Sequence, residues 1–183
     1  MPVPRLSEEQ TAWIIQQVAK YIEQQREAYK RKAAPLDSHQ KSAMRPFFPA
    51  SLLDSARVLV LGGERVSNPP FYPELQRMGF DPAALPNFAF MAAITFVDTV
   101  VSHEAFTHRL LFHELVHVVQ HEKLGLQGFA SKYVRGFLSG GSYEAIPLEI
   151  NAYDLDARFV AAPTKAFSVR DEVQAWVDAD QRF

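Results

Sequence analysis

Residues 105–123 combine a helical pattern that is apolar nearly all round with three ionisable side chains. His113, Glu114 and His117 stand among aliphatic and aromatic neighbours: Leu110, Leu111, Phe112, Leu115, Val116, Val118 and Val119. A helix that is apolar on every face lies in the interior of a protein. Buried imidazole and carboxylate groups are unfavourable unless something pairs with them. The chain must therefore fold so that these three side chains meet partners inside it.

The spacing of the two histidines indicates a metal site. His113-Glu114-Leu115-Val116-His117 is an H-E-x-x-H motif, and side chains at i and i+4 lie about 5–6 Å apart on one helix face. Both imidazoles can therefore bind one ion, with Glu114 turned by ~100° so that it flanks the ion as a general base. The chain has no cysteine, so the expected Zn2+ must be held by histidine and carboxylate. The alternative is that both histidines only hydrogen-bond to backbone carbonyls.

A third ligand is not available from the same helix. In the pattern H-E-x-x-H-x-x-G-x-x-H, the glycine position is Gln120 and the last histidine position is Lys123. His121 lies ~12 Å along the axis from His113, so we expect it at the surface, near the negative end of the helix. The third ligand must come from another segment.

A second predicted helix, from Pro147 to about residue 160, offers a carboxylate. Its apolar stripe repeats at helical spacing and comprises Leu148, Ala152, Leu155 and Phe159. Glu149 lies beside that stripe and can reach the His113/His117 face. Glu144, in the preceding turn, is a competing ligand. Asp154 is better explained as a partner of Arg158, and Glu122 as a surface residue.

The order of these motifs resembles a known family. H-E-L-V-H-V-V-Q at 113–120 and P-x-E-x-x-A-Y at 147–153 resemble the thermolysin-like gluzincins, which are zinc metallopeptidases, and are closer still to small bacterial H-E-x-x-H domains of uncharacterised function. The resemblance covers roughly residues 92–160. It implies that His113, His117 and Glu149 bind zinc and that Glu114 is the general base. The family's histidine-orienting aspartate is replaced by Tyr153, so Asp156, or else Asp154 or Asp98, is expected to take that role.

Peptide hydrolysis also needs a group that stabilises the oxyanion. We expect Tyr143, just before the glutamate helix, to be this catalytic donor, although it could equally be a buried aromatic residue that holds the loop. The other possible donors are Tyr133, Tyr153, His103, His108 and Arg135. His103 and His108 are five residues apart and share no helix face, so we do not expect them to form a second site.

The remaining patterns predict an α+β, zincin-like fold. They indicate an amphipathic helix at 7–33 with a Ser7/Gln10 capping box, an irregular segment at 34–56, a short buried strand at 57–61 and a long loop at 62–90. A strand at 92–101, a short helix at 129–138 and a last helix at about 169–180 follow. We expect a small, mostly antiparallel sheet packed against the two site helices. Residues 1–183 are expected to form one zincin-like metallopeptidase domain with 7–33 as an appendage.

Charge and composition narrow the classes of binding partner that we expect. The net charge of −2 and a pI near 6.3 argue against nucleic acid and anionic membranes as partners. The N-terminus lacks the apolar run of a signal peptide, and no stretch reaches the ~18 apolar residues of a membrane span. We therefore expect a cytoplasmic protein. The sequence predicts no oligomeric state.

The leading hypothesis is a zinc-dependent metallopeptidase acting on a peptide or protein substrate. An extended peptide would add to the edge strand at 92–101, while Glu114 takes a proton from water and passes it to the leaving amine. A second hypothesis is a zinc-stabilised, non-catalytic binding module that uses the Pro- and aromatic-rich segment 67–90. A third is a latent hydrolase covered by its own Pro-rich segments.

Overall fold

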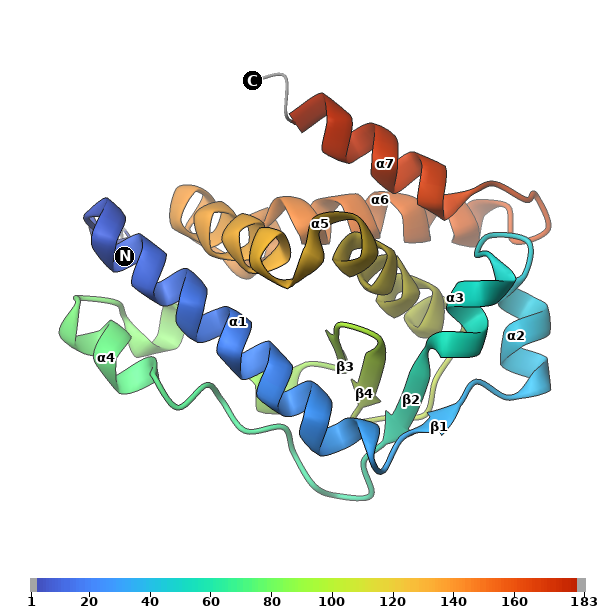
Figure 1. Ribbon diagram of the computed structural model, residues 1–183, viewed down its shortest axis with the longest axis horizontal. Helices are drawn as coiled ribbons and strands as arrows, with labels where there is room; N and C mark the ends of the chain where they lie inside the picture. Colours follow the sequence, from blue (N-terminus) through green and yellow to red (C-terminus); the bar gives the residue numbers. More distant parts are fainter. Residues whose placement is uncertain (1–2, 181–183) are drawn as a thin grey trace.

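The computed structural model describes residues 3–180 as a mixed α+β protein. Figure 1 shows its helices around a small sheet. The helices are α1 (Glu8–Lys30), α2 (Ser38–Met44), α3 (Ala50–Ser55), α4 (Tyr72–Arg77), α5 (His108–Gly140), α6 (Pro147–Ala161) and α7 (Val169–Asp180). The strands are β1 (Ala34–Pro35), β2 (Arg57–Val60), β3 (Ala93–Phe96) and β4 (Thr99–Ser102). Short 3-10 turns span Pro82–Ala84, Phe88–Phe90 and Tyr143–Ala145.

The four strands form one mixed sheet in the order β1-β2-β4-β3. The outer pairs are antiparallel, as expected, but β2 and β4 run parallel. The α+β class is confirmed, whereas the sheet is mixed. The assignment of the whole chain to one domain stays a prediction.

The single strand expected at 92–101 is wrong, because the chain turns within it. Val97 adopts a φ of 62°, and β3 and β4 pair as a hairpin on either side of it. Asp98 stabilises the turn, since its carboxylate accepts hydrogen bonds from Arg26 at 2.8 Å and Lys30 at 2.9 Å, both on α1. These partners lie about seventy residues away in sequence, so no local pattern could reveal them.

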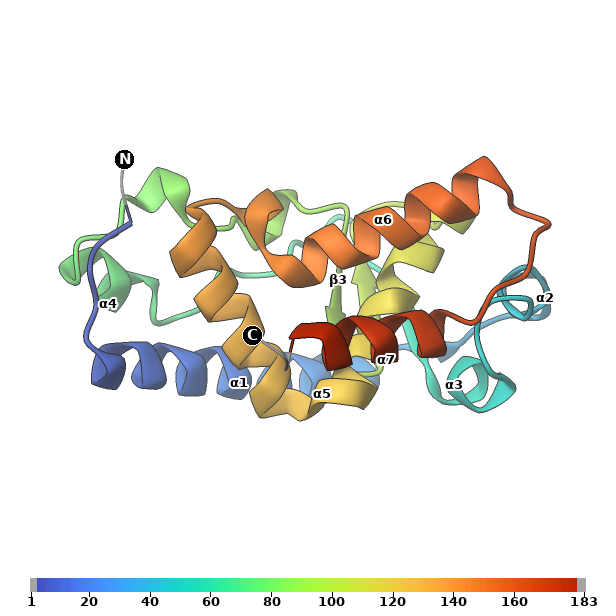
Figure 2. The same ribbon diagram turned by 90° about the horizontal axis from the view of Figure 1, so that it is seen from above.

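The helices expected at 105–123 and 129–138 are two halves of α5, which is kinked at Gly125. It begins after the cap Thr107, whose side chain accepts from the Leu110 amide, and Gly125 has non-helical angles (φ 67°, ψ 171°). Glycine adopts this left-handed φ without the strain that a side chain brings. Figure 2 shows the two halves of α5 meeting at an angle, with α6 lying along the molecule beside them. The first half carries the H-E-x-x-H motif.

The N-terminal third contains more regular structure than expected. The Ser7/Gln10 capping box of α1 is confirmed, with both reciprocal hydrogen bonds present. The irregular segment expected at 34–56 is wrong, because α2 and α3 form there, α2 with its own Asp37/Gln40 capping box. β2 is present but only partly buried, since Val60 at its end is 48% exposed.

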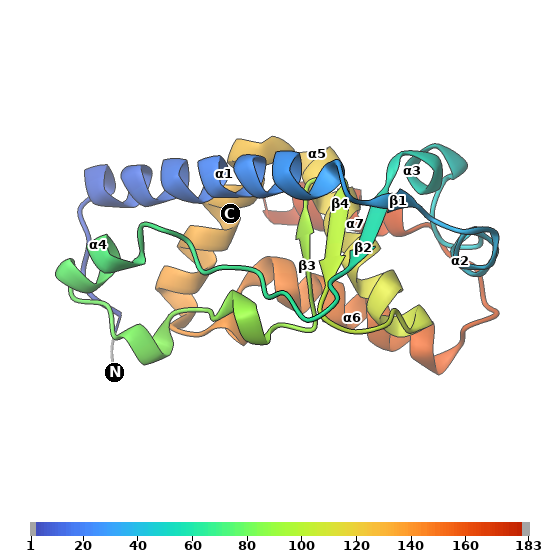
Figure 3. The same ribbon diagram turned by 90° about the horizontal axis from the view of Figure 1, so that it is seen from below.

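Two apolar clusters hold these elements together. One surrounds Phe112 and joins α2, α3, α5, α6 and α7. The other surrounds Phe96 and joins α1, the segment around α4, β3 and the second half of α5. Figure 3 shows α1 running along the hairpin, with the α4 segment at the same end of the molecule as the start of α1. The half of α5 that carries the H-E-x-x-H motif packs in the first cluster, and the half after the kink packs in the second.

Candidate metal centre

The structure brings the three predicted ligands together. His113 and His117 lie one turn apart on α5, and their Nε2 atoms are 3.2 Å from each other. Glu149 reaches across from the first turn of α6, with its two carboxylate oxygens 3.5 Å from the Nε2 atoms of His113 and His117 respectively. All three residues are buried, and one ligand atom from each lies within 4.8 Å of the others. This group could hold a metal ion.

The start of α6 lies close against α5, and this places Glu149 near the two histidines. Pro147 occupies the first turn of α6, where a missing N–H has no consequence and a fixed φ favours the helix. Gly136 on α5 lies directly against it: a Cβ built on Gly136 would lie 2.4 Å from Pro147 Cδ. The absence of a side chain at Gly136 therefore lets α6 start close to α5, two residues before Glu149.

The charges of the cluster are strongly coupled. Burial opposes the charged form of His113, but Asp156 and Glu149 raise its pKa to about 9. Burial likewise opposes the charged form of His117, whose pKa is nevertheless raised by Glu149. The two histidines hold the pKa of the buried Glu149 well below its usual range. The cluster thus attracts positive charge, which a metal cation can supply in place of a proton.

His113 is oriented by the aspartate that the sequence favoured. Its Nδ1 lies 3.2 Å from Asp156 Oδ2, and Asp156 accepts from Arg109 through its other oxygen at 3.0 Å. Asp98 instead binds α1, and Asp154 is exposed. A hydrogen bond at Nδ1 fixes the ring so that Nε2 faces Glu149.

His117 is oriented by a residue that sequence reasoning missed. Gln120 is completely buried, and its Oε1 lies 2.8 Å from His117 Nδ1. Its Nε2 donates to the Leu148 carbonyl at 3.0 Å and to Asn151 Oδ1 at 2.9 Å, both on α6. Gln120 therefore links the ring of one ligand to the helix that carries another. A glutamine three residues after His117 on a buried helix was the available signal.

Glu114 lies beside the ligands without joining them. It is 4% exposed, and its Oε2 accepts a hydrogen bond of 2.7 Å from the Thr95 hydroxyl. The same hydroxyl lies 3.2 Å from the Glu114 carbonyl oxygen. Thr95 is in β3, nineteen residues earlier, and no sequence motif marks it as a functional residue. The sheet thus holds the carboxylate of Glu114 in place.

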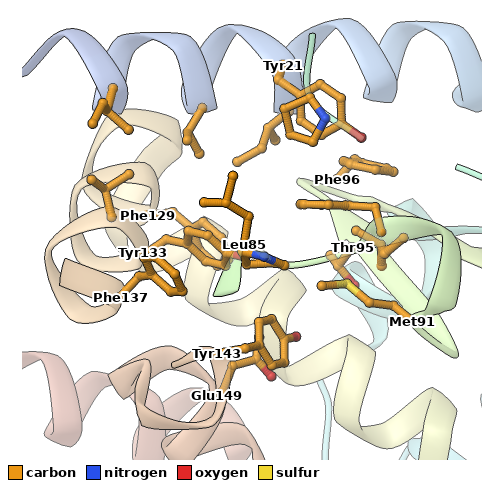
Figure 4. A pocket seen from close by; sticks show the side chains of 18 of the residues that line it. Tyr21, Leu85, Met91, Thr95, Phe96, Phe129, Tyr133, Phe137, Tyr143 and Glu149 are labelled. Atoms are coloured by element: carbon orange, nitrogen blue, oxygen red, sulfur yellow. The ribbon is translucent and has the colours of Figure 1, made fainter. Parts of the chain in front are cut away.

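The predicted donor Tyr143 lies next to the site. It belongs to the 3-10 turn before α6, and Figure 4 shows its ring beside Glu149. Burial and the nearby Glu149 raise the pKa of Tyr143 well above its usual value, so its hydroxyl stays protonated. Tyr153 packs its ring 4.6 Å from that of His113 and is the other tyrosine that covers a ligand.

Three of the other candidate donors, His103, Arg135 and His108, have contacts elsewhere. His103 lies with Nδ1 2.6 Å from the Met91 carbonyl and accepts from the Val66 amide at 3.0 Å, so it ties the long loop to β4. Arg135 pairs with Glu8, and the ring of His108 lies 5.1 Å from that of His39. None of these three lies in the metal cluster among residues 3–180.

Three expectations about neighbouring residues need correction. His121 is not at the surface: it is 4% exposed and stacks on Phe129 at 3.7 Å, because the kink at Gly125 folds the second half of α5 over it. Burial lowers the pKa of His121 to about 3, so it is neutral. Arg158 pairs with Glu172 rather than Asp154. The competing ligand Glu144 is exposed and outside the cluster.

A mostly apolar cavity of about 100 Å³ adjoins the ligands. Glu114, His117, Glu149, Tyr143 and Thr95 form part of its wall. Figure 4 shows how the rest is built: Phe129, Tyr133 and Phe137 from α5 face Phe96 and Met91 across the cavity, with Tyr21 of α1 closing a third side. The polar groups of the metal centre therefore open onto an apolar space.

In comparisons with known proteins, no family model, no curated protein and no solved structure matches this chain. No helix among residues 3–180 combines the length and the apolar character that crossing a membrane requires.

Proposed function

We propose that this protein is a zinc-dependent metallopeptidase of the gluzincin type, with a zincin-like fold, that hydrolyses peptide bonds in a peptide or protein substrate. The observation that carries the proposal is the position of Glu114. A structural zinc site is closed by four protein ligands and needs no further carboxylate as a base. Here the carboxylate of Glu114, which is not a ligand, is buried next to the ligands and is held by Thr95.

The donor geometry supports zinc. Two atoms bound at ~2.0–2.1 Å to one tetrahedral ion lie roughly 3.3 Å apart. The three measured separations, 3.2 Å between the imidazoles and 3.5 Å from each imidazole to Glu149, agree with this value. Three protein ligands leave one position open, which is the pattern of a catalytic rather than a structural zinc site. When bound, zinc would acidify water and polarise a carbonyl oxygen.

The residues around the ligands supply the other requirements of hydrolysis. Glu114 accepts a proton from the attacking water and delivers it to the leaving nitrogen. Tyr143, with its protonated hydroxyl beside Glu149, is the donor to the developing oxyanion. β3 is the last strand of the sheet and lines the cavity with Ala93–Phe96. An extended substrate can therefore lie along β3 and reach Glu114.

The test is cleavage of a peptide library by the full chain, loaded with zinc and then treated with chelator. We expect cleavage that chelator abolishes and that zinc restores. Glu114→Gln should bind zinc and cleave nothing. Glu104→Gln changes an exposed glutamate in the segment before α5 and should cleave normally. A chain that binds zinc but cleaves no peptide would instead be a zinc-stabilised binding module.

A further inference from the structure

The cavity next to the metal centre has the size of a single aromatic ring. Its volume is about 100 Å³, of the same order as the ~150 Å³ apolar cavity that binds benzene when engineered into another protein. No Lys or Arg is among the residues that line it. Away from the metal centre an anionic group would therefore find no counter-charge, and a long chain would not fit.

One tyrosine hydroxyl inside this cavity has no partner. The Tyr133 hydroxyl is buried and makes no hydrogen bond to any group in residues 3–180. The other three tyrosines of the same wall have partners: Tyr21 donates to the Ser67 carbonyl at 2.6 Å, Tyr72 donates to the Pro86 carbonyl at 2.7 Å, and Tyr143 pairs with Glu149. A buried hydroxyl without a partner lowers the stability of the folded state, so phenylalanine would be the more stable residue at position 133.

The surroundings of Tyr133 define the group that can pair with it. Burial and the neighbouring Tyr72 and Glu149 raise the pKa of Tyr133 well above its ordinary value, so the hydroxyl stays neutral and can both donate and accept. Figure 4 shows Tyr133 between Phe129 and Phe137, on the second half of α5. A complementary ligand therefore combines a flat apolar ring with one neutral hydroxyl.

We propose that this cavity is a binding subsite for a phenol ring, such as a tyrosine side chain, whose hydroxyl hydrogen-bonds with the hydroxyl of Tyr133. That the ring belongs to the substrate rests on the proposed peptidase function. Ring binding itself does not. Tyr133 is then the residue that distinguishes tyrosine from phenylalanine, because a site with a buried polar group rejects an analogue that leaves this group unpaired.

Binding of two matched small molecules tests the subsite without any catalysis. Calorimetric titration of the full chain, metal-free and zinc-loaded, compares p-cresol with toluene. We expect p-cresol to bind about tenfold more tightly than toluene. Tyr133→Phe should abolish this preference while leaving the chain folded and at least as stable. Tyr72→Phe, from the same wall, should keep the preference and lose stability. Equal binding of the two probes by the natural chain, no binding of either, or an unchanged preference in Tyr133→Phe would overturn the proposal.

A kinetic comparison links the subsite to the reaction. Library peptides that differ only by tyrosine or phenylalanine next to the cleaved bond should differ by about tenfold in kcat/KM in the natural chain and not in Tyr133→Phe. Cleavage with no tyrosine preference would contradict the subsite's role and leave the peptidase function standing. p-Cresol binding without any peptide cleavage would support the phenol subsite and contradict the peptidase function.

Discussion

The hydrogen bond between Thr95 and Glu114 makes a quantitative prediction. Thr95→Val keeps the shape of the side chain and removes the hydroxyl that lies 2.7 Å from Glu114 Oε2. Thr95 is 7% exposed and Glu114 4% exposed, so water cannot easily replace the lost donor. Leaving a buried acceptor unpaired costs about 1–3 kcal/mol. For a chain of this length, 2 kcal/mol corresponds to a fall in Tm of ~4–8 °C.

The assay is urea unfolding of a double-mutant cycle. It comprises the natural chain, Thr95→Val, Glu114→Gln and the double variant. If the hydroxyl acts through the carboxylate, the valine substitution should be less destabilising in the Glu114→Gln background, by about 1 kcal/mol. Zinc binding should be the same in all four proteins, because neither residue is a ligand. Additive effects of the two substitutions would refute the assigned contact, as would a Thr95→Val variant with unchanged stability.

Three further predictions follow from contacts around the site and the hairpin. Gln120→Leu should weaken zinc binding by about 10–100-fold, measured by competition with a fluorescent chelator, because His117 Nδ1 loses its partner; unchanged affinity would contradict this role. Gly136→Ala should destabilise the chain by about 1–3 kcal/mol in thermal unfolding, because the added Cβ would clash with Pro147. The control Gly62→Ala should leave stability unchanged, because nothing lies within 4 Å of its Cβ. Burial opposes ionisation of Asp98, but Arg26 and Lys30 hold its pKa well below the usual value. The stabilisation that ionised Asp98 gives is therefore present above the unfolded pKa of ~3.9 and is lost as the pH falls through the folded pKa. The natural chain should therefore be more stable than Asp98→Asn at pH 7, with a smaller difference at pH 3; an equal difference at both pH values would show that the ion pairs do not act in this way.

The ligand set could be read from the sequence because each part of it is local. The i, i+4 spacing places His113 and His117 on one face, and Pro147 marks the start of the helix that carries Glu149. Asp156 was also accessible, since it lies two turns after Glu149 on the same helix. These features depend on helical periodicity alone.

The structural features that the sequence did not predict depend on contacts between distant segments. The turn at Asp98 is stabilised by α1, the burial of His121 follows from the kink that brings Phe129 over it, and Thr95 meets Glu114 only once β3 packs on α5. The cavity is the extreme case, because α1, α4, β3, α5 and α6 all contribute residues to its wall. No pattern within one segment contains this information.

We propose that His113, His117 and Glu149 bind one zinc ion through their side chains, and X-ray absorption at the zinc edge of the zinc-loaded chain tests this binding. The account predicts one zinc per chain with two imidazole nitrogens and a carboxylate oxygen at ~2.0–2.2 Å, and the loss of one imidazole signal in His113→Ala. A chain that takes up no zinc, or a zinc spectrum that His113→Ala leaves unchanged, would contradict it.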